Sequence, residues 1–149
     1  MSKTFRSLQY RNARLFFAGL ALSNIGTWAQ FTAVALLVDR LTGRTTAIGV
    51  LTALQFLPML LFGAWAGAIA DRVDRLRMTR VTQGLMAVEA VTIAAFDLTD
   101  TISLPIVYVL TAFLGIAAAF DNPARRGFVT ELVPPDQITN AVSLNTAVM

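Results

Sequence analysis

The sequence contains neither cysteine nor histidine among its 149 residues. Their absence excludes disulfide bridges, thiolate and imidazole catalysis, and the commonest protein ligands of zinc and haem iron. The remaining residues form no pairing of nucleophile with base and no metal-ligand motif, so we expect no enzymatic activity, no cofactor and no metal site. Any chemistry must therefore come from carboxylates, guanidinium groups and neutral polar side chains.

Charged residues are also scarce. They make up 14% of the chain, against about a quarter in an ordinary soluble domain. Hydrophobic residues make up 56% and the mean hydropathy is +0.63, with long uncharged runs of the length that crosses about 30 Å of hydrocarbon. The net charge of +3 does not indicate a nucleic-acid partner, because the basic residues flank the apolar runs. The composition predicts an all-α membrane protein embedded in a lipid bilayer.

The apolar pattern predicts four complete membrane-spanning helices and the start of a fifth, at residues 15–38, 47–70, 78–98, 103–120 and 137–149. The first run is longer than the apolar core of a cleaved signal peptide, so we expect it to be retained. Pro58 should bend the second helix, and Asn122-Pro123 indicates a helix stop. Because the fifth segment is too short to span, the chain looks like the first part of a longer protein.

The basic residues also predict an orientation. All but two of the 12 lysine and arginine residues precede the first helix or lie in the loops that follow the second and fourth helices. The two exceptions, Arg40 and Arg44, lie between the first and second helices. The positive-inside rule therefore predicts a cytoplasmic N-terminus.

The loop between the second and third helices carries a recognisable motif. Its sequence, GAIADRVDRLR from Gly67 to Arg77, resembles the signature G-x-L-A-D-R-x-G-R-[KR] of the major facilitator superfamily. The matching residues are Gly67, Ala70, Asp71, Arg72 and Arg75. Asp74 stands where the family usually has glycine, and a basic residue is displaced to Arg77. The resemblance implies the first half of a major facilitator fold, a multi-spanning helical bundle that transports by alternating access.

In this family the loop acts as a conformational latch, and the resemblance implies that role for Gly67, Asp71, Arg72 and Arg75. A carboxylate and guanidinium groups at the membrane edge can pair in one conformation and separate in another. The alternative is that the arginines only fix topology and contact lipid phosphates. Asp121, expected at the end of the fourth helix, is predicted to pair with Arg75 and complete the latch.

A second resemblance lies after the fourth helix. The segments Asn-Pro-Ala-Arg at 122–125, Glu-Leu-Val-Pro at 131–134 and Asn-Ala at 140–141 resemble the enterobactin-exporter and macrolide-efflux branch of the superfamily. That branch exports drugs and siderophores, so the resemblance implies efflux rather than uptake. The alternative is that Asn-Pro and Pro-Pro in these segments only end helices.

Two acidic residues are candidate proton carriers. Glu89 lies about 18 Å from the charged loop by helix rise, near the middle of the membrane, where an ionisable group is costly and suggests function. A buried acid paired for structure is the alternative. Asp39, at the outer end of the first helix, would receive protons or gate the outer mouth, unless it is an interfacial charge beside Arg40.

Three polar residues of the first helix, Asn24, Thr27 and Gln30, are candidate cavity-lining residues, because the first helix lines the central cavity in this family. Hydrogen bonding between helices is the equal alternative. We therefore expect a secondary active exporter of a small amphipathic compound in the bacterial inner membrane, driven by proton antiport. An uptake permease of the same superfamily and a non-transporting membrane scaffold are the rival interpretations.

Overall fold

The computed structural model describes residues 10–148, which are almost entirely helical and contain no strand. Its α-helices are α1 (Arg11–Thr42), α2 (Thr45–Ala70), α3 (Arg75–Leu98), α4 (Leu104–Glu131) and α5 (Ile138–Val148), with the 3-10 turn Pro135–Gln137 before α5. The first four are each long and apolar enough to cross a membrane. The predicted multi-spanning helical bundle is confirmed.

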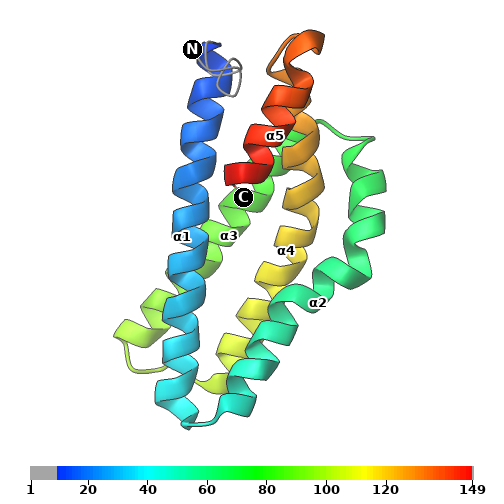
Figure 1. Ribbon diagram of the computed structural model, residues 1–149. Helices are drawn as coiled ribbons and strands as arrows, with labels where there is room; N and C mark the ends of the chain where they lie inside the picture. Colours follow the sequence, from blue (N-terminus) through cyan, green and yellow to red (C-terminus); the bar gives the residue numbers. More distant parts are fainter. Residues whose placement is uncertain (1–9, 149) are drawn as a thin grey trace.

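The helices form a bundle in which α4 packs against α2, α3 and α5. Figure 1 shows the start of α1, the α2–α3 loop and the end of α4 at the same end of the bundle. We call this the N-terminal end, and the end with the α1–α2 and α3–α4 connections the opposite end. Large apolar side chains cover the outside, among them Leu60 at 80% exposure and Leu98 at 86%. Such a surface suits lipid rather than water.

The α2–α3 loop is short because two local features end one helix and begin the next. Asp71 follows α2 with a right-handed backbone conformation, and its N–H bonds to the Gly67 carbonyl at 3.1 Å. Asp74 is the N-cap of α3, and its carboxylate accepts the Arg77 N–H at 2.6 Å. Because the φ angle of Asp74 is −61°, this position needs no glycine. The departure from the family signature therefore provides a helix cap.

The end of α4 differs from the sequence prediction. We expected the helix to stop near Phe120, before Asn122-Pro123, but it continues through Pro123 to Glu131. A proline inside a helix removes one backbone bond, and membrane helices tolerate that loss because neighbouring groups compensate for it. Asp121 consequently lies inside α4 rather than at its end.

The other boundaries differ by a few residues. Helix α1 begins at Arg11 rather than Leu15, and α3 begins at Arg75 rather than Met78. The predicted fifth segment is divided into a 3-10 turn and α5, and its last residue, Met149, lies outside the described residues. Lys3 and Arg6, used in the orientation argument, lie outside them as well.

Helix α2 is bent near its middle, and its later half diverges from α4 (Figure 1). Pro58 lies within this helix and leaves the Leu54 carbonyl without its usual N–H partner. At this level α4 presents Gly115, where an added Cβ would lie 2.8 Å from the Leu54 oxygen and 2.6 Å from the Gln55 oxygen. Only glycine permits so close an approach of the two backbones.

Candidate functional site: a charged latch and a buried polar network

Arg75 is the centre of a charged cluster at the N-terminal end of the bundle. Its guanidinium donates to Asp71 Oδ1 at 3.2 Å and to Glu131 Oε1 at 3.1 Å. It also donates to the Gly127 carbonyl at 3.3 Å. Asp71 follows α2, Arg75 begins α3, and Glu131 ends α4. One side chain therefore ties three helix ends together, and we call these four residues the Arg75 latch.

Gly127 provides the surface on which Arg75 lies. A Cβ added at this glycine would stand 2.6 Å from Arg75 Nε and 2.8 Å from Cζ. Any larger residue would therefore displace the guanidinium. Neither Gly127 nor Glu131 was predicted as a site residue, because the sequence prediction ended the fourth helix before both. In a helix that continues past Asp121, Gly127 and Glu131 are four residues apart and therefore lie on the same face.

The ion pairs of Arg75 with Asp71 and Glu131 are partly exposed to solvent. The Arg75 side chain is 27% exposed, Asp71 is 74% exposed and Glu131 is 53% exposed. Exposed ion pairs of this kind contribute about 0–1 kcal/mol each. Their distances also exceed the 2.7–2.9 Å typical of strong charge-assisted bonds. The contacts are thus individually weak, yet together they connect three elements.

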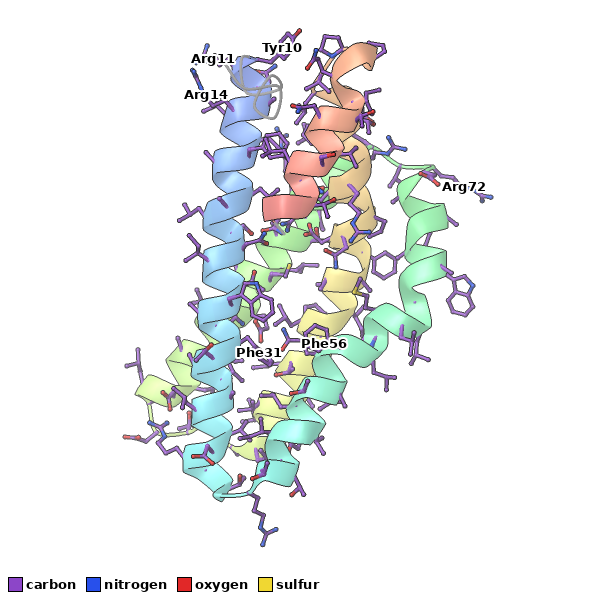
Figure 2. All side chains as sticks on the ribbon, viewed as in Figure 1. Tyr10, Arg11, Arg14, Phe31, Phe56 and Arg72 are labelled. Carbon is purple, nitrogen blue, oxygen red and sulfur yellow. The ribbon has the colours of Figure 1, made fainter. Side chains whose placement is uncertain are left out.

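The other predicted latch residues contribute less directly. Gly67 lies one turn before the end of α2 and accepts the Asp71 N–H, and a Cβ there would meet nothing within 4 Å. Arg72 is exposed and extends away from the bundle (Figure 2). Its place in the latch stays a prediction.

The predicted pairing of Asp121 with Arg75 is wrong. Asp121 is 2% exposed within α4 and pairs instead with Arg125, one turn further along the same helix. It also accepts Thr82 Oγ1 at 2.7 Å and Gln83 Nε2 at 2.9 Å from α3. Since α4 continues past Pro123, Asp121 lies too deep in the bundle to reach the loop.

These contacts form a second site, which we call the buried network: Ser23, Thr82, Gln83, Asp121 and Arg125. Ser23 of α1 donates to Gln83 Oε1 at 3.0 Å and so extends the network across three helices. The side chains of Asp121 and Arg125 are 3% and 8% exposed. A buried pair offsets its own desolvation only when its remaining polar groups are bonded, as Thr82 and Gln83 achieve for the carboxylate. The network fixes the positions of α1, α3 and α4 relative to one another.

Glu89 lies deep in α3, as expected. It is 3% exposed, and the Gln30 side chain of α1 donates to its Oε2 at 2.6 Å. The other carboxylate oxygen, Oε1, is buried and has no hydrogen-bond partner within residues 10–148. Fourteen residues of α3 separate it from Arg75, about 21 Å along the helix. Hydrogen bonding between helices is confirmed for Gln30.

The remaining candidates lie apart from these two clusters. Asp39 is exposed near the end of α1, and its neighbour Arg40 forms an ion pair with Asp97 at the end of α3. Thr27 donates to the Ser23 carbonyl of its own helix at 3.0 Å. Asn24 is half-buried in α1. A role of these residues in gating or in lining a cavity stays a prediction.

Groups of three or more acidic side chains close enough to hold a metal ion are absent from residues 10–148. The clusters instead consist of ion pairs and amide or hydroxyl hydrogen bonds between helices. Such groups can hold or release a helix end.

The chain is similar to known membrane transporters. The model of the transmembrane secretion effector family matches residues 2–149. The staphyloferrin A transporter of Staphylococcus aureus is 24% identical over 138 residues, 91% of this chain and 34% of that protein. Macrolide efflux protein A of Streptococcus pyogenes is 30% identical over 139 residues, 88% of this chain and 33% of that protein.

An uncharacterized major facilitator transporter of Bacillus subtilis is 28% identical over 133 residues, 89% of this chain and 30% of that protein. This chain spans about a third of the length of these relatives. No solved structure matches it. The match to the family model over nearly the whole chain and the membrane-length helices lead to one conclusion: the chain belongs to the transmembrane secretion effector family of the major facilitator superfamily of membrane transporters.

Proposed function

We propose that the full-length protein is a secondary active exporter of a small amphipathic compound, of the drug or siderophore type. This chain would form the first part of the first six-helix bundle. The similarity to a macrolide efflux protein supports export, and the similarity to a staphyloferrin A transporter supports a compound of the siderophore type. The Asn-Pro-Ala-Arg segment at 122–125 supports the same direction.

The observation that carries this proposal is the Arg75 latch. An alternating-access transporter needs helix ends that are held together in one state and released in the other. Arg75 connects the ends of α2 and α4 through Asp71 and Glu131, by exposed contacts that separate at little cost. In one state the Arg75 latch would be formed and would close the N-terminal end of the bundle. In the other state the latch would be broken and that end would be open.

The proposed location is the bacterial inner membrane, with the N-terminal end of the bundle facing the cytoplasm. Arg11 and Arg14 at the start of α1, Arg72 after α2, and Arg126 near the end of α4 all lie at that end. Positively charged residues accumulate on the cytoplasmic side of membrane proteins. Arg40 and Arg44 are the described basic residues at the opposite end.

The proposed source of energy is a proton gradient, used by proton antiport, and Glu89 is the proposed proton carrier. Its depth within α3, its single donor from Gln30 and its second, unbonded oxygen support the proposal. An ionisable side chain deep in a membrane-spanning helix is costly to bury, and such groups commonly mark proton pathways. Asp39 is the second candidate, although its exposure makes a controlled proton transfer harder.

The latch is tested by Glu131→Gln in the full-length protein, with efflux of a radiolabelled macrolide from cells as the readout. Removing the Glu131 charge takes away the ion pair between Arg75 and the end of α4 and leaves only the bond to the Gly127 carbonyl, so we expect efflux to fall several-fold. Asp97→Asn is the matched control, because it breaks the Arg40–Asp97 ion pair at the opposite end. Efflux by Glu131→Gln that equals the measurable efflux of the unchanged protein would show that the Arg75–Glu131 pair has no part in transport.

Flux in membrane vesicles of known orientation tests the direction. An exporter loads inside-out vesicles when a proton gradient is imposed, whereas an uptake permease loads right-side-out vesicles. A non-transporting scaffold loads neither. Accumulation that does not respond to collapse of the proton gradient would contradict proton antiport while leaving export intact.

A further inference from the structure

A groove runs along the outside of the bundle between α2, α3 and α4, near the N-terminal end. Its volume is about 620 Å³. Its walls are almost entirely apolar and include Met78, Val81, Leu85, Phe113, Ile116 and Phe120. The charged residues among its lining, Asp74 and Arg77, both lie at the end nearest the α2–α3 loop. The groove is therefore an apolar slot with a charged mouth.

The shape of the groove follows from the α2–α4 contact. Gly115 brings α4 against the backbone of α2 at Leu54 and Gln55. Beyond that contact α2 bends at Pro58 and moves away from α4, while the short loop after Ala70 returns the chain to α3. The space opens where the two helices separate.

The length of the groove matches one leaflet of a bilayer. Arg77 and Leu85 are eight residues apart on α3, or about 12 Å along the helix. Half of a 30 Å hydrocarbon core is about 15 Å. With Arg77 at the level of the headgroups, the apolar walls thus cover most of the depth of one leaflet. An extended acyl chain has the shape to fill such a slot.

The charges at the mouth favour a phosphate. The Asp74 carboxylate is used to cap α3, and Arg75 is held by the Arg75 latch. The Arg77 side chain is exposed and forms no ion pair within residues 10–148. An arginine in this position attracts the headgroup of an anionic lipid.

We propose that this groove is a binding site for a membrane phospholipid, with one acyl chain between α2, α3 and α4 and its phosphate on Arg77. Anionic headgroups are preferred because Arg77 at the mouth forms no ion pair within residues 10–148, whereas the neighbouring Asp74 is bonded to the start of α3. The inference requires a membrane-spanning chain, but neither the proposed substrate nor the proposed direction of transport. A lipid bound here lies beside the α2–α3 loop and hence beside the Arg75 latch.

Fluorescence quenching by brominated lipids tests the site. In the full-length protein every native tryptophan, Trp28 and Trp65 of this chain included, is replaced by phenylalanine, and one reporter is placed in the groove by Leu85→Trp. A matched reporter on the same helix comes from Val88→Trp, because Val88 is 64% exposed and lies outside the groove. Both proteins are placed in bilayers that contain phosphatidylglycerol or phosphatidylcholine brominated on the acyl chains. Relative affinities for the two lipids follow from the quenching.

We expect phosphatidylglycerol to be preferred about fivefold at the Leu85→Trp reporter and not at the Val88→Trp reporter. Arg77→Ala should remove the preference, whereas Arg72→Ala should preserve most of it. Equal preference at the two reporters would overturn the proposal. So would strong quenching of the Val88→Trp reporter with none at Leu85→Trp, because a second copy of the protein or a transported compound would then occupy the groove. Transport activity does not enter this measurement, so its failure is separate from that of the proposed function.

Discussion

Replacing Gly127 with alanine tests the Arg75 latch without removing any charge. The new Cβ would lie 2.6 Å from Arg75 Nε and 2.8 Å from Cζ. Comfortable contacts between such atoms are about 3.5–4.0 Å, so the guanidinium must move by roughly 1 Å. Its bonds to Asp71 and Glu131 are already 3.2 and 3.1 Å long, and a shift of this size breaks them.

The effects on folding and on the latch are expected to separate. Alanine in a helix interior is favoured over glycine by about 1 kcal/mol, which offsets the loss of exposed ion pairs worth about 0–1 kcal/mol each. The midpoint of thermal unfolding should therefore change little. The latched state, in contrast, loses up to about 2 kcal/mol relative to the open state, so its population should fall by up to about thirtyfold.

Gly84→Ala is the matched control for this experiment. Gly84 lies within α3, and an added Cβ there would meet nothing within 4 Å. The substitution should give the same gain in helix propensity without touching Arg75. Thermal unfolding and efflux of the exported compound are measured for both variants of the full-length protein.

A direct readout of the latch comes from the distance between nitroxide labels at Val73→Cys and Arg126→Cys. Both positions are exposed, and they lie on the α2–α3 loop and near the end of α4. In the Gly127→Ala background the distance distribution should broaden, and in the Gly84→Ala background it should not. Unchanged distances and unchanged efflux in Gly127→Ala would refute the reasoning that the glycine seats Arg75 for a functional contact.

Three further predictions concern the packing, the buried network and the proposed proton carrier. Gly115→Ala should destabilise the protein by about 1–3 kcal/mol, because its Cβ would meet backbone oxygens that cannot move aside; Gly63→Ala, with open space around it, should be nearly neutral in thermal unfolding. Asp121→Asn should cost about 3–5 kcal/mol by leaving the buried Arg125 charge uncompensated, and adding Arg125→Gln should restore most of the thermal stability; no recovery would argue against a paired network. Glu89→Gln can still bond to Gln30, so the protein should fold but lose proton-driven efflux, whereas retained coupling would exclude Glu89 as the carrier.

Several features could be predicted from the sequence because they depend on local composition. Uncharged runs of about 20 residues must cross the bilayer as helices, since only internal hydrogen bonding satisfies the backbone there. Helices α1 to α4 follow from this rule alone. The bend at Pro58 and the depth of Glu89 follow equally from position along one helix. The family resemblance rested on a contiguous loop motif, which also needs no tertiary information.

Contacts between helices could not be predicted in the same way, because they depend on how each helix is rotated and how far it extends. From the sequence, Asp121 is expected near the level of the α2–α3 loop, because Pro123 indicates that α4 ends there. In the structure α4 continues through Pro123. Once α4 continues to Glu131, Asp121 points at Gln83 and Thr82 inside the bundle, and Glu131 reaches Arg75 instead. Proline weakens a helix locally, and whether it ends the helix depends on what surrounds it.

The sequence by itself determined that this chain has several helices long and apolar enough to cross a membrane. It also determined that the loop between the second and third helices resembles the signature of a transporter superfamily. Hydrophobic length and a contiguous motif are properties of the chain alone. Only the tertiary structure decided which carboxylate Arg75 binds, that Gly127 seats it, and that α2 and α4 separate beyond Gly115 to leave a groove. These features arise because ion pairs and close backbone contacts require two helices to meet at the same depth and on facing sides.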